Sequence, residues 1–167
     1  TYSIAIGHQA GLENQKQENI AIGNQAGNSL QGKAIANVGD GGFSIAIGSA
    51  AGQTEQNEYS IAIGANAGNN TQLNYAIAIG RNAGHTSQQN GTIALGYKSG
   101  ENIQGKYAIA LGAEAGLSSQ RENAIALGHY AGKYIQGGYA IAIGAGAGSG
   151  SIDIDKNMVG GQGGSSI

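Results

Sequence analysis

The sequence predicts an all-β fold, a β-solenoid of about nine 16-residue coils, on three observations. An apolar Ile-Ala-Ile-Gly or Ile-Ala-Leu-Gly motif recurs, beginning at Ile4, Ile20, Ile45, Ile61, Ile77, Ile93, Ile109, Ile125 and Ile141. Successive motifs begin 16 residues apart, except for one interval of 25. Glycine fills 32 of the 167 positions, and proline and cysteine are absent. Self-similarity at a fixed short period is typical of solenoids, in which each repeat stacks on the next.

Each motif predicts a short β-strand. We number the first isoleucine of a motif as position 0. The aliphatic residues at positions 0 and +2 then share one face, and the alanine at +1 takes the other, as a period of two requires. The alternation alone does not say which of the two faces meets a partner.

Turns are predicted at two glycines that lie four residues apart in every coil. Glycine occupies position +3 in every coil, from Gly7 to Gly144, and position +7, from Gly11 to Gly148. Glycine permits positive φ and a close approach of two backbones. The chain is therefore expected to turn there in every coil.

Glutamine recurs at position +11, which predicts a structural ladder. The column contains Gln15, Gln31, Gln56, Gln72, Gln88, Gln104, Gln120 and Gln136. Amides stacked at the strand spacing of about 4.8 Å can bond to one another or cap a buried turn carbonyl. A ligand-binding glutamine array is the alternative.

The repeat predicts one domain over residues 1–150, with an irregular insertion at about 30–44, where residues 35–39 resemble a degraded motif. Residues 151–167 lose the glutamine and the spacing, and we expect a degenerate C-terminal cap or a linker there. An open end of a solenoid exposes a strand edge, which a cap would cover.

Composition excludes several classes of protein. Only 5% of the residues are aromatic, and the 40% that are hydrophobic are mostly alanine and isoleucine, which suits thin layers rather than a bulky core. Burial between neighbouring chains is then an expected source of stability, and an outward alanine column would favour it. A net charge of −2 offers no basic surface for nucleic acid or anionic lipid. No apolar stretch is long enough for membrane insertion, so we expect a soluble segment.

Two units, Ser3–Gly11 and Ser60–Gly68, read Ser-Ile-Ala-Ile-Gly-x-x-Ala-Gly. They resemble the YadA-like head repeats of trimeric autotransporter adhesins, and the 16-residue form with its glutamine is similar to repeats in phage and viral attachment fibres. The resemblance implies a left-handed parallel β-roll that assembles as a parallel homotrimer. It also implies an extracellular adhesin on a cell or virion surface that binds a host glycan, a cell-wall polymer or a matrix protein.

Catalysis, cofactors and metals are not expected. His8, His85 and His129 occupy different positions in distant coils, and no phosphate-binding glycine motif occurs. Asp153–Asn157 begins like a calcium loop but lacks its glycine and its closing glutamate. A β-helical acyltransferase would need an aliphatic residue at every sixth position, and an ice-binding solenoid would need aligned threonines; neither pattern is present.

The variable turn positions are where a ligand site is expected, because a repeated scaffold displays the columns that it leaves free. Towards the C-terminal end these columns collect Tyr97, Lys98, His129, Tyr130, Lys133 and Tyr134. Tyrosine beside a cation can stack on sugars, so we take these residues as the tentative ligand site. Solvated turn residues of a passive fibre spacer are the alternative. A column of aromatic residues at position −2 is expected to pack at the coil edge or across a subunit seam. It contains Tyr2, Phe43, Tyr59, Tyr75, Tyr107 and Tyr139.

Overall fold

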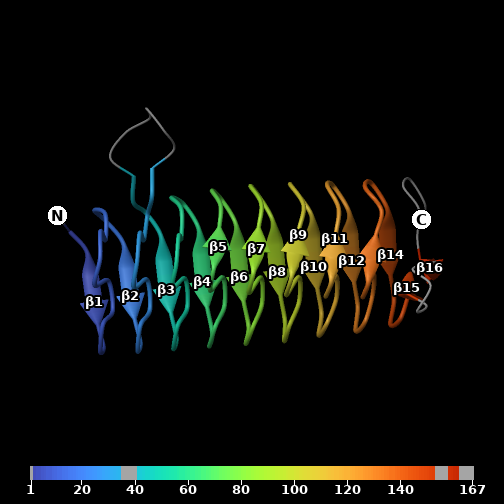
Figure 1. Ribbon diagram of the computed structural model, residues 1–167, viewed down its shortest axis with the longest axis horizontal. Coiled ribbons are helices and arrows are strands. Elements are labelled where there is room, and N and C mark those ends of the chain that lie inside the picture. Colours follow the sequence, from blue (N-terminus) through green and yellow to red (C-terminus); the bar gives the residue numbers. More distant parts are fainter. Residues whose placement is uncertain (1, 35–40, 153–157, 162–167) are drawn as a thin grey trace.

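The computed structural model of the chain describes residues 2–34, 41–152 and 158–161. It is an elongated rod in which short strands stack side by side along the long axis (Figure 1). Within these residues there is no helix that is long and apolar enough to cross a membrane.

Nine strands form one parallel sheet along the rod. They are β1 (Ile4–Ile6), β2 (Ile20–Ile22), β3 (Ile45–Ile47), β4 (Ile61–Ile63), β6 (Ile77–Ile79), β8 (Ile93–Leu95), β10 (Ile109–Leu111), β12 (Ile125–Leu127) and β14 (Ile141–Ile143). Each motif pairs with the next in register, so Ile77 lies opposite Ile93. The prediction of an all-β parallel solenoid is confirmed, with about 8 turns.

A second parallel sheet of five strands follows another side of the coil. Its members are β5 (Thr71–Gln72), β7 (Ser87–Gln88), β9 (Ile103–Gln104), β11 (Ser119–Gln120) and β13 (Ile135–Gln136). In the first three coils, position +10 instead has a positive φ, at Asn14, Leu30 and Glu55. Isolated bridges, such as the one between Ser29 and Thr54, replace the ladder there.

Alanine fills the interior of the coil. The central alanine of every strand from β2 to β14 is fully buried, and so is the alanine at position +6 in most coils, whereas the isoleucines on either side are half-buried or exposed. The alternation therefore places alanine inside and isoleucine outside. Isoleucine, and not alanine, is the apolar column available to a partner.

The glycine at position +3 allows adjacent coils to approach closely. Gly64 has a φ of 123°, and a Cβ added there would lie 2.8 Å from the carbonyl carbon and oxygen of Gly80 in the next coil. Because both neighbours are backbone atoms, no side-chain movement can relieve the clash. The predicted turn at this position is therefore also a close backbone contact between coils.

The 25-residue interval rejoins the stack without loss of register. Ile20 lies opposite Ile45 as if the interval were 16. Asn19 joins the two ends of this interval. Its Oδ1 accepts a 2.7 Å hydrogen bond from Ser44 N, and its Nδ2 donates a 2.9 Å bond to Gln31 O. The predicted degraded motif at residues 35–39 lies outside the described residues.

The C-terminal end departs from the parallel pattern. Strands β15 (Ser149–Ile152) and β16 (Met158–Gly161) pair antiparallel with each other. This pairing begins near residue 151, where we expected a cap or linker to start. The loop at Asp153–Asn157, considered above for calcium, lies outside the described residues.

Candidate functional site

The glutamines at position +11 form a column inside the coil, and those from Gln31 to Gln136 are at most 1% exposed. Gln120 illustrates the bonding. Its Nε2 donates to Ile109 O at 2.7 Å, to Ala124 O at 3.0 Å and to Gln136 Oε1 at 3.2 Å. The side chain thus joins its own coil to the next one. A ligand outside the coil has no access to these amides.

The glutamine column requires the glycine column at position +7. A Cβ added to Gly84 would lie 2.3 Å from Gln88 Cδ, and the same substitution at Gly132 would put it 2.6 Å from Gln136 Oε1. Glycine at +7 therefore creates the space that the amide occupies four residues later.

The amide-to-amide bonds are not continuous. They join Gln15 to Gln31, Gln56 to Gln72, and the four glutamines from Gln88 to Gln136 in sequence. Gln56 Oε1 and Gln88 Oε1, at the breaks, are buried without a hydrogen-bond partner. At each break the bonds to backbone carbonyls still hold the glutamine in place.

The tentative ligand residues fall into two clusters. The first, which we name the C-terminal cluster, contains His129, Tyr130, Lys133 and Tyr134. The His129 and Tyr130 rings stack with centroids 3.7 Å apart. Lys133 Nζ lies 4.0 Å from the centre of the Tyr130 ring and 5.6 Å from that of Tyr134. One ammonium group is thus shared by two aromatic faces.

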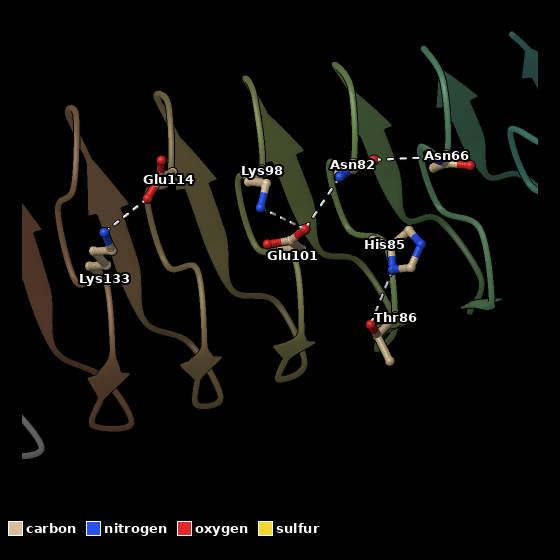
Figure 2. Close-up of polar contacts among 8 residues, drawn as sticks. All are labelled: Asn66, Asn82, His85, Thr86, Lys98, Glu101, Glu114 and Lys133. Atoms are coloured by element: carbon tan, nitrogen blue, oxygen red, sulfur yellow. Dashed lines mark hydrogen bonds and ion pairs between the residues drawn. The ribbon is translucent and has the colours of Figure 1, made fainter. Parts of the chain in front are cut away.

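Glu114, in the preceding coil, forms an ion pair with Lys133 of the C-terminal cluster. Its Oε2 accepts a 2.9 Å bond from Lys133 Nζ (Figure 2). This hydrogen bond is the main reason that the pKa of Lys133 rises above its ordinary value of 10.5. Lys133 therefore stays charged at neutral pH, and its carboxylate partner compensates part of that charge.

The second cluster surrounds Tyr97 and Lys98. The Arg81 guanidinium lies 4.8 Å from the centre of the Tyr97 ring, and Lys98 Nζ lies 5.7 Å from it. Lys98 also pairs with Glu101 at 3.5 Å. Figure 2 shows Lys98 and Glu101 on the same side of the rod as Glu114 and Lys133, so the two clusters lie along one face.

One relationship in these columns was not recognised from the sequence. A residue at position +5 meets the residue at +8 of the next coil, 19 positions later in a regular coil, as in the pairs Asn82 with Glu101 and Glu114 with Lys133. The same diagonal recurs through the backbone where Asn69 Nδ2 bonds to Ala50 O. The sequence signal for this contact was a spacing of 19 residues, which is one 16-residue repeat plus three residues. The turn columns are thus partly coupled, and Lys98 and Lys133 have structural partners.

The histidines lie apart, as expected from their positions. His8 and His129 are exposed, and His85 Nδ1 lies 3.4 Å from Thr86 Oγ1. No group of three or more metal-ligating side chains occurs in the part of the chain that the structure describes.

The outer face of the main sheet is aliphatic along its whole length. Its exposed members include Ile4, Ile6, Leu95, Leu127 and Ile143, and the remaining residues at positions 0 and +2 are half-buried. We name this surface the isoleucine face. Exposed apolar patches of this extent mark interaction surfaces in soluble proteins.

The comparison with protein families identifies the repeat. A family model described as the YadA head domain repeat (2 copies) matches residues 56–67, which span the end of one coil and strand β4. The chain carries YadA-like head repeats. The matched segment includes one of the nine motifs that pair in register along the rod. Searches of curated proteins and of solved structures gave no significant match.

Proposed function

We propose that this chain is a non-catalytic segment of a trimeric adhesin or attachment fibre. Three copies assemble in parallel as left-handed β-rolls, and the trimer attaches its parent cell or virion to a host surface. The observation that carries this proposal is the isoleucine face, because a YadA-like repeat that keeps alanine inside leaves its largest aliphatic side chains uncovered.

Covering the isoleucine face supplies the energy for assembly. Complete burial of an isoleucine side chain contributes about 1.5–3 kcal/mol, and each of the nine strands presents two aliphatic residues that are only partly buried. A cyclic assembly covers all of these faces around one axis. Three rods in parallel also keep equivalent coils at the same level.

The face that carries the two clusters is the proposed ligand surface. Tyr130, Lys133 and Tyr134 combine aromatic planes with a cation, a combination that suits the apolar face and the hydroxyls of a sugar. A trimer presents Tyr130, Lys133 and Tyr134 three times. Multivalency of this kind raises overall affinity by about 10²–10⁴ when geometry permits simultaneous contact. We therefore propose a host-surface glycan as the ligand, ahead of a cell-wall polymer or a matrix protein.

Attachment to a host places the segment outside the cell, on a cell or virion surface. The rigid rod then holds the ligand surface away from its point of anchorage. A passive spacer with the binding domain elsewhere is the competing function.

Binding of the labelled trimer to host cells and to immobilised glycans tests the proposal. Light scattering first establishes whether the protein is a trimer. The double variant Tyr130→Ser/Tyr134→Ser is then compared with Leu12→Ser, which changes an exposed residue of the first coil outside both clusters. We expect at least about a tenfold loss of binding for the double variant and none for the control.

The alternatives give different results. Wild-type trimer that labels no cell or glycan indicates a spacer. Equal binding by the double variant and the wild type removes the C-terminal cluster as the site. A monomer at micromolar concentration contradicts the trimer itself.

A further inference from the structure

Two exposed columns border the isoleucine face, one on each side. The aromatic column at position −2 precedes each strand, and a second column at position +4 follows it. We name the latter the +4 column; it comprises His8, Asn24, Ser49, Ala65, Arg81, Tyr97, Ala113, His129 and Ala145. The two columns lie six positions apart in the chain, with a strand between them, which is up to roughly 20 Å of extended chain. Within one protomer the columns therefore lie at opposite edges of the face.

Side-chain sizes in the two columns are complementary, coil by coil. Where position −2 is aromatic, position +4 is usually small, as in Phe43 with Ser49, Tyr59 with Ala65, Tyr107 with Ala113 and Tyr139 with Ala145. In two of the three coils where position −2 lacks an aromatic side chain, the +4 residue is aromatic, as in Gly91 with Tyr97 and Asn123 with His129. Columns that never touch have no physical reason to compensate each other in size.

In two of the remaining three coils, the residues at positions −2 and +4 are chemically compatible with contact for a reason other than size. The third coil lies at the end of the rod. Tyr75 corresponds to Arg81, and an aromatic ring attracts a guanidinium group. Glu18 corresponds to Asn24, and both are polar. Tyr2 corresponds to His8; both are large, and they belong to the first coil, where Tyr2 is 88% exposed.

The aromatic column is costly in a single chain. Its members from Phe43 to Tyr139 have φ near +60°, a conformation that bulky L-residues rarely adopt. Gly91 and Asn123 occupy the same conformation and are the residue types that tolerate it best. An aromatic residue kept at such a position is expected to make a compensating contact.

Only part of that compensation exists within the protomer. The rings of Phe43, Tyr59 and Tyr75 stack with centroids 5.2 and 5.3 Å apart. Tyr107 and Tyr139 are 59% and 65% exposed, and neither joins an aromatic stack among the described residues. The Tyr107 ring packs over Gly91 of its own chain, and the exposed area that both rings retain is available to a neighbouring protomer.

Cyclic symmetry identifies that surface. In a ring of identical faces, the leading edge of one protomer meets the trailing edge of the next. We propose that the aromatic column of each protomer packs, coil for coil, against the +4 column of the neighbouring protomer and so closes the seam. This inference rests on the proposed trimer, and the occupant is a second copy of this chain. It assigns Tyr97 and His129 to the seam and leaves Tyr130, Lys133 and Tyr134 for the ligand.

A size exchange within one coil tests the pairing. Ala113→Tyr puts a large residue opposite Tyr107 of the neighbouring protomer, and we expect the trimer to dissociate at least about tenfold more readily, as overpacking predicts. Adding Tyr107→Gly reproduces the natural combination of Gly91 with Tyr97 and restores assembly. The matched control, Ala113→Tyr with Tyr139→Gly, makes the same exchange in different coils and does not restore it. Sedimentation equilibrium measures each variant.

Cysteine pairs give a second, direct test, because the natural chain has no cysteine. A disulfide requires Cα atoms within about 7 Å, so Tyr59→Cys with Ala65→Cys links protomers only if the two edges meet. Each protomer then bonds to two neighbours, and a covalent trimer appears on a non-reducing gel. Tyr59→Cys with Ala145→Cys, several coils apart, serves as the control and forms none.

The outcomes separate the edge pairing from the trimer. A wild-type trimer in which the size exchange fails to restore assembly and the cysteines fail to link overturns the pairing alone. Covalent dimers without trimers also overturn it. A wild-type monomer overturns both the pairing and the proposed assembly.

Discussion

The side-chain amide of Gln120 donates a 3.2 Å hydrogen bond to the side-chain amide of Gln136, one coil further along the rod. The same Nε2 also lies 2.7 Å from Ile109 O, at the first residue of strand β10. A single buried side chain therefore ties a strand of the main sheet to the interior of the next coil. This column therefore contributes to the stability of the rod through buried hydrogen bonds.

Replacing Gln120 with leucine is expected to destabilise the fold by about 1–3 kcal/mol. The substitution keeps the volume but leaves Ile109 O and Gln136 Oε1 without the amide donor, and a buried polar group that loses its partner costs about that much. Guanidinium unfolding followed by circular dichroism measures the change. Gln89→Leu is the control, because Gln89 is only partly buried and its expected effect is small. Equal stability of the two variants would contradict a structural role for the column.

Gly64→Ala is expected to cost about 2–5 kcal/mol, the sum of overpacking and an unfavourable positive φ. The added Cβ would lie 2.8 Å from the backbone carbonyl of Gly80, and Gly64 has a φ of 123°. Gly138→Ala is the matched control, since its nearest neighbour lies 3.4 Å from the added Cβ and its φ is not positive. Thermal unfolding distinguishes the two variants. A Gly64→Ala protein as stable as the control is incompatible with the packing between coils described above.

Substitutions at Ile77 and Ala78 are expected to have different effects although the residues are adjacent. Ala78 is fully buried, so Ala78→Ile overpacks the coil and destabilises the fold by about 1–3 kcal/mol. Ile77 faces outward, so Ile77→Ser leaves the β-structure intact and weakens self-association. Circular dichroism reports the fold and sedimentation velocity the assembly. The opposite pattern would mean that alanine, and not isoleucine, lies at the interface.

The ion pair between Lys133 and Glu114 predicts a pH dependence at alkaline pH. Because Glu114 raises the pKa of Lys133 in the folded state, the pair adds stability below the ordinary value of 10.5 and loses it as pH rises through the folded value. Glu114→Gln removes the carboxylate, so the pKa of Lys133 should fall towards its ordinary value. NMR titration of the Lys133 side chain measures this shift, with Lys106, in no ion pair among the described residues, as the internal reference. An unchanged Lys133 titration in the variant would exclude the pair as the cause.

The sequence by itself determined the strands, the turns and the stack of coils. Period-two alternation in Ile77-Ala78-Ile79 specifies a strand, and the 16-residue interval specifies its in-register partner, because both are local properties of the chain. A structural role for the glutamine and glycine columns could also be predicted, since a position that never varies in a repeat must meet the same surroundings in every coil.

Only the tertiary structure decided which side of each strand faces inward. Alternation is unchanged when its two faces are exchanged, so the motif alone could not choose between Ile77 and Ala78. The interior width decides it, because glutamine amides and neighbouring backbone already fill the coil and leave space for little more than a methyl group. The diagonal from Glu114 to Lys133 likewise appears only once the coils are stacked, since it combines one full repeat with three further residues.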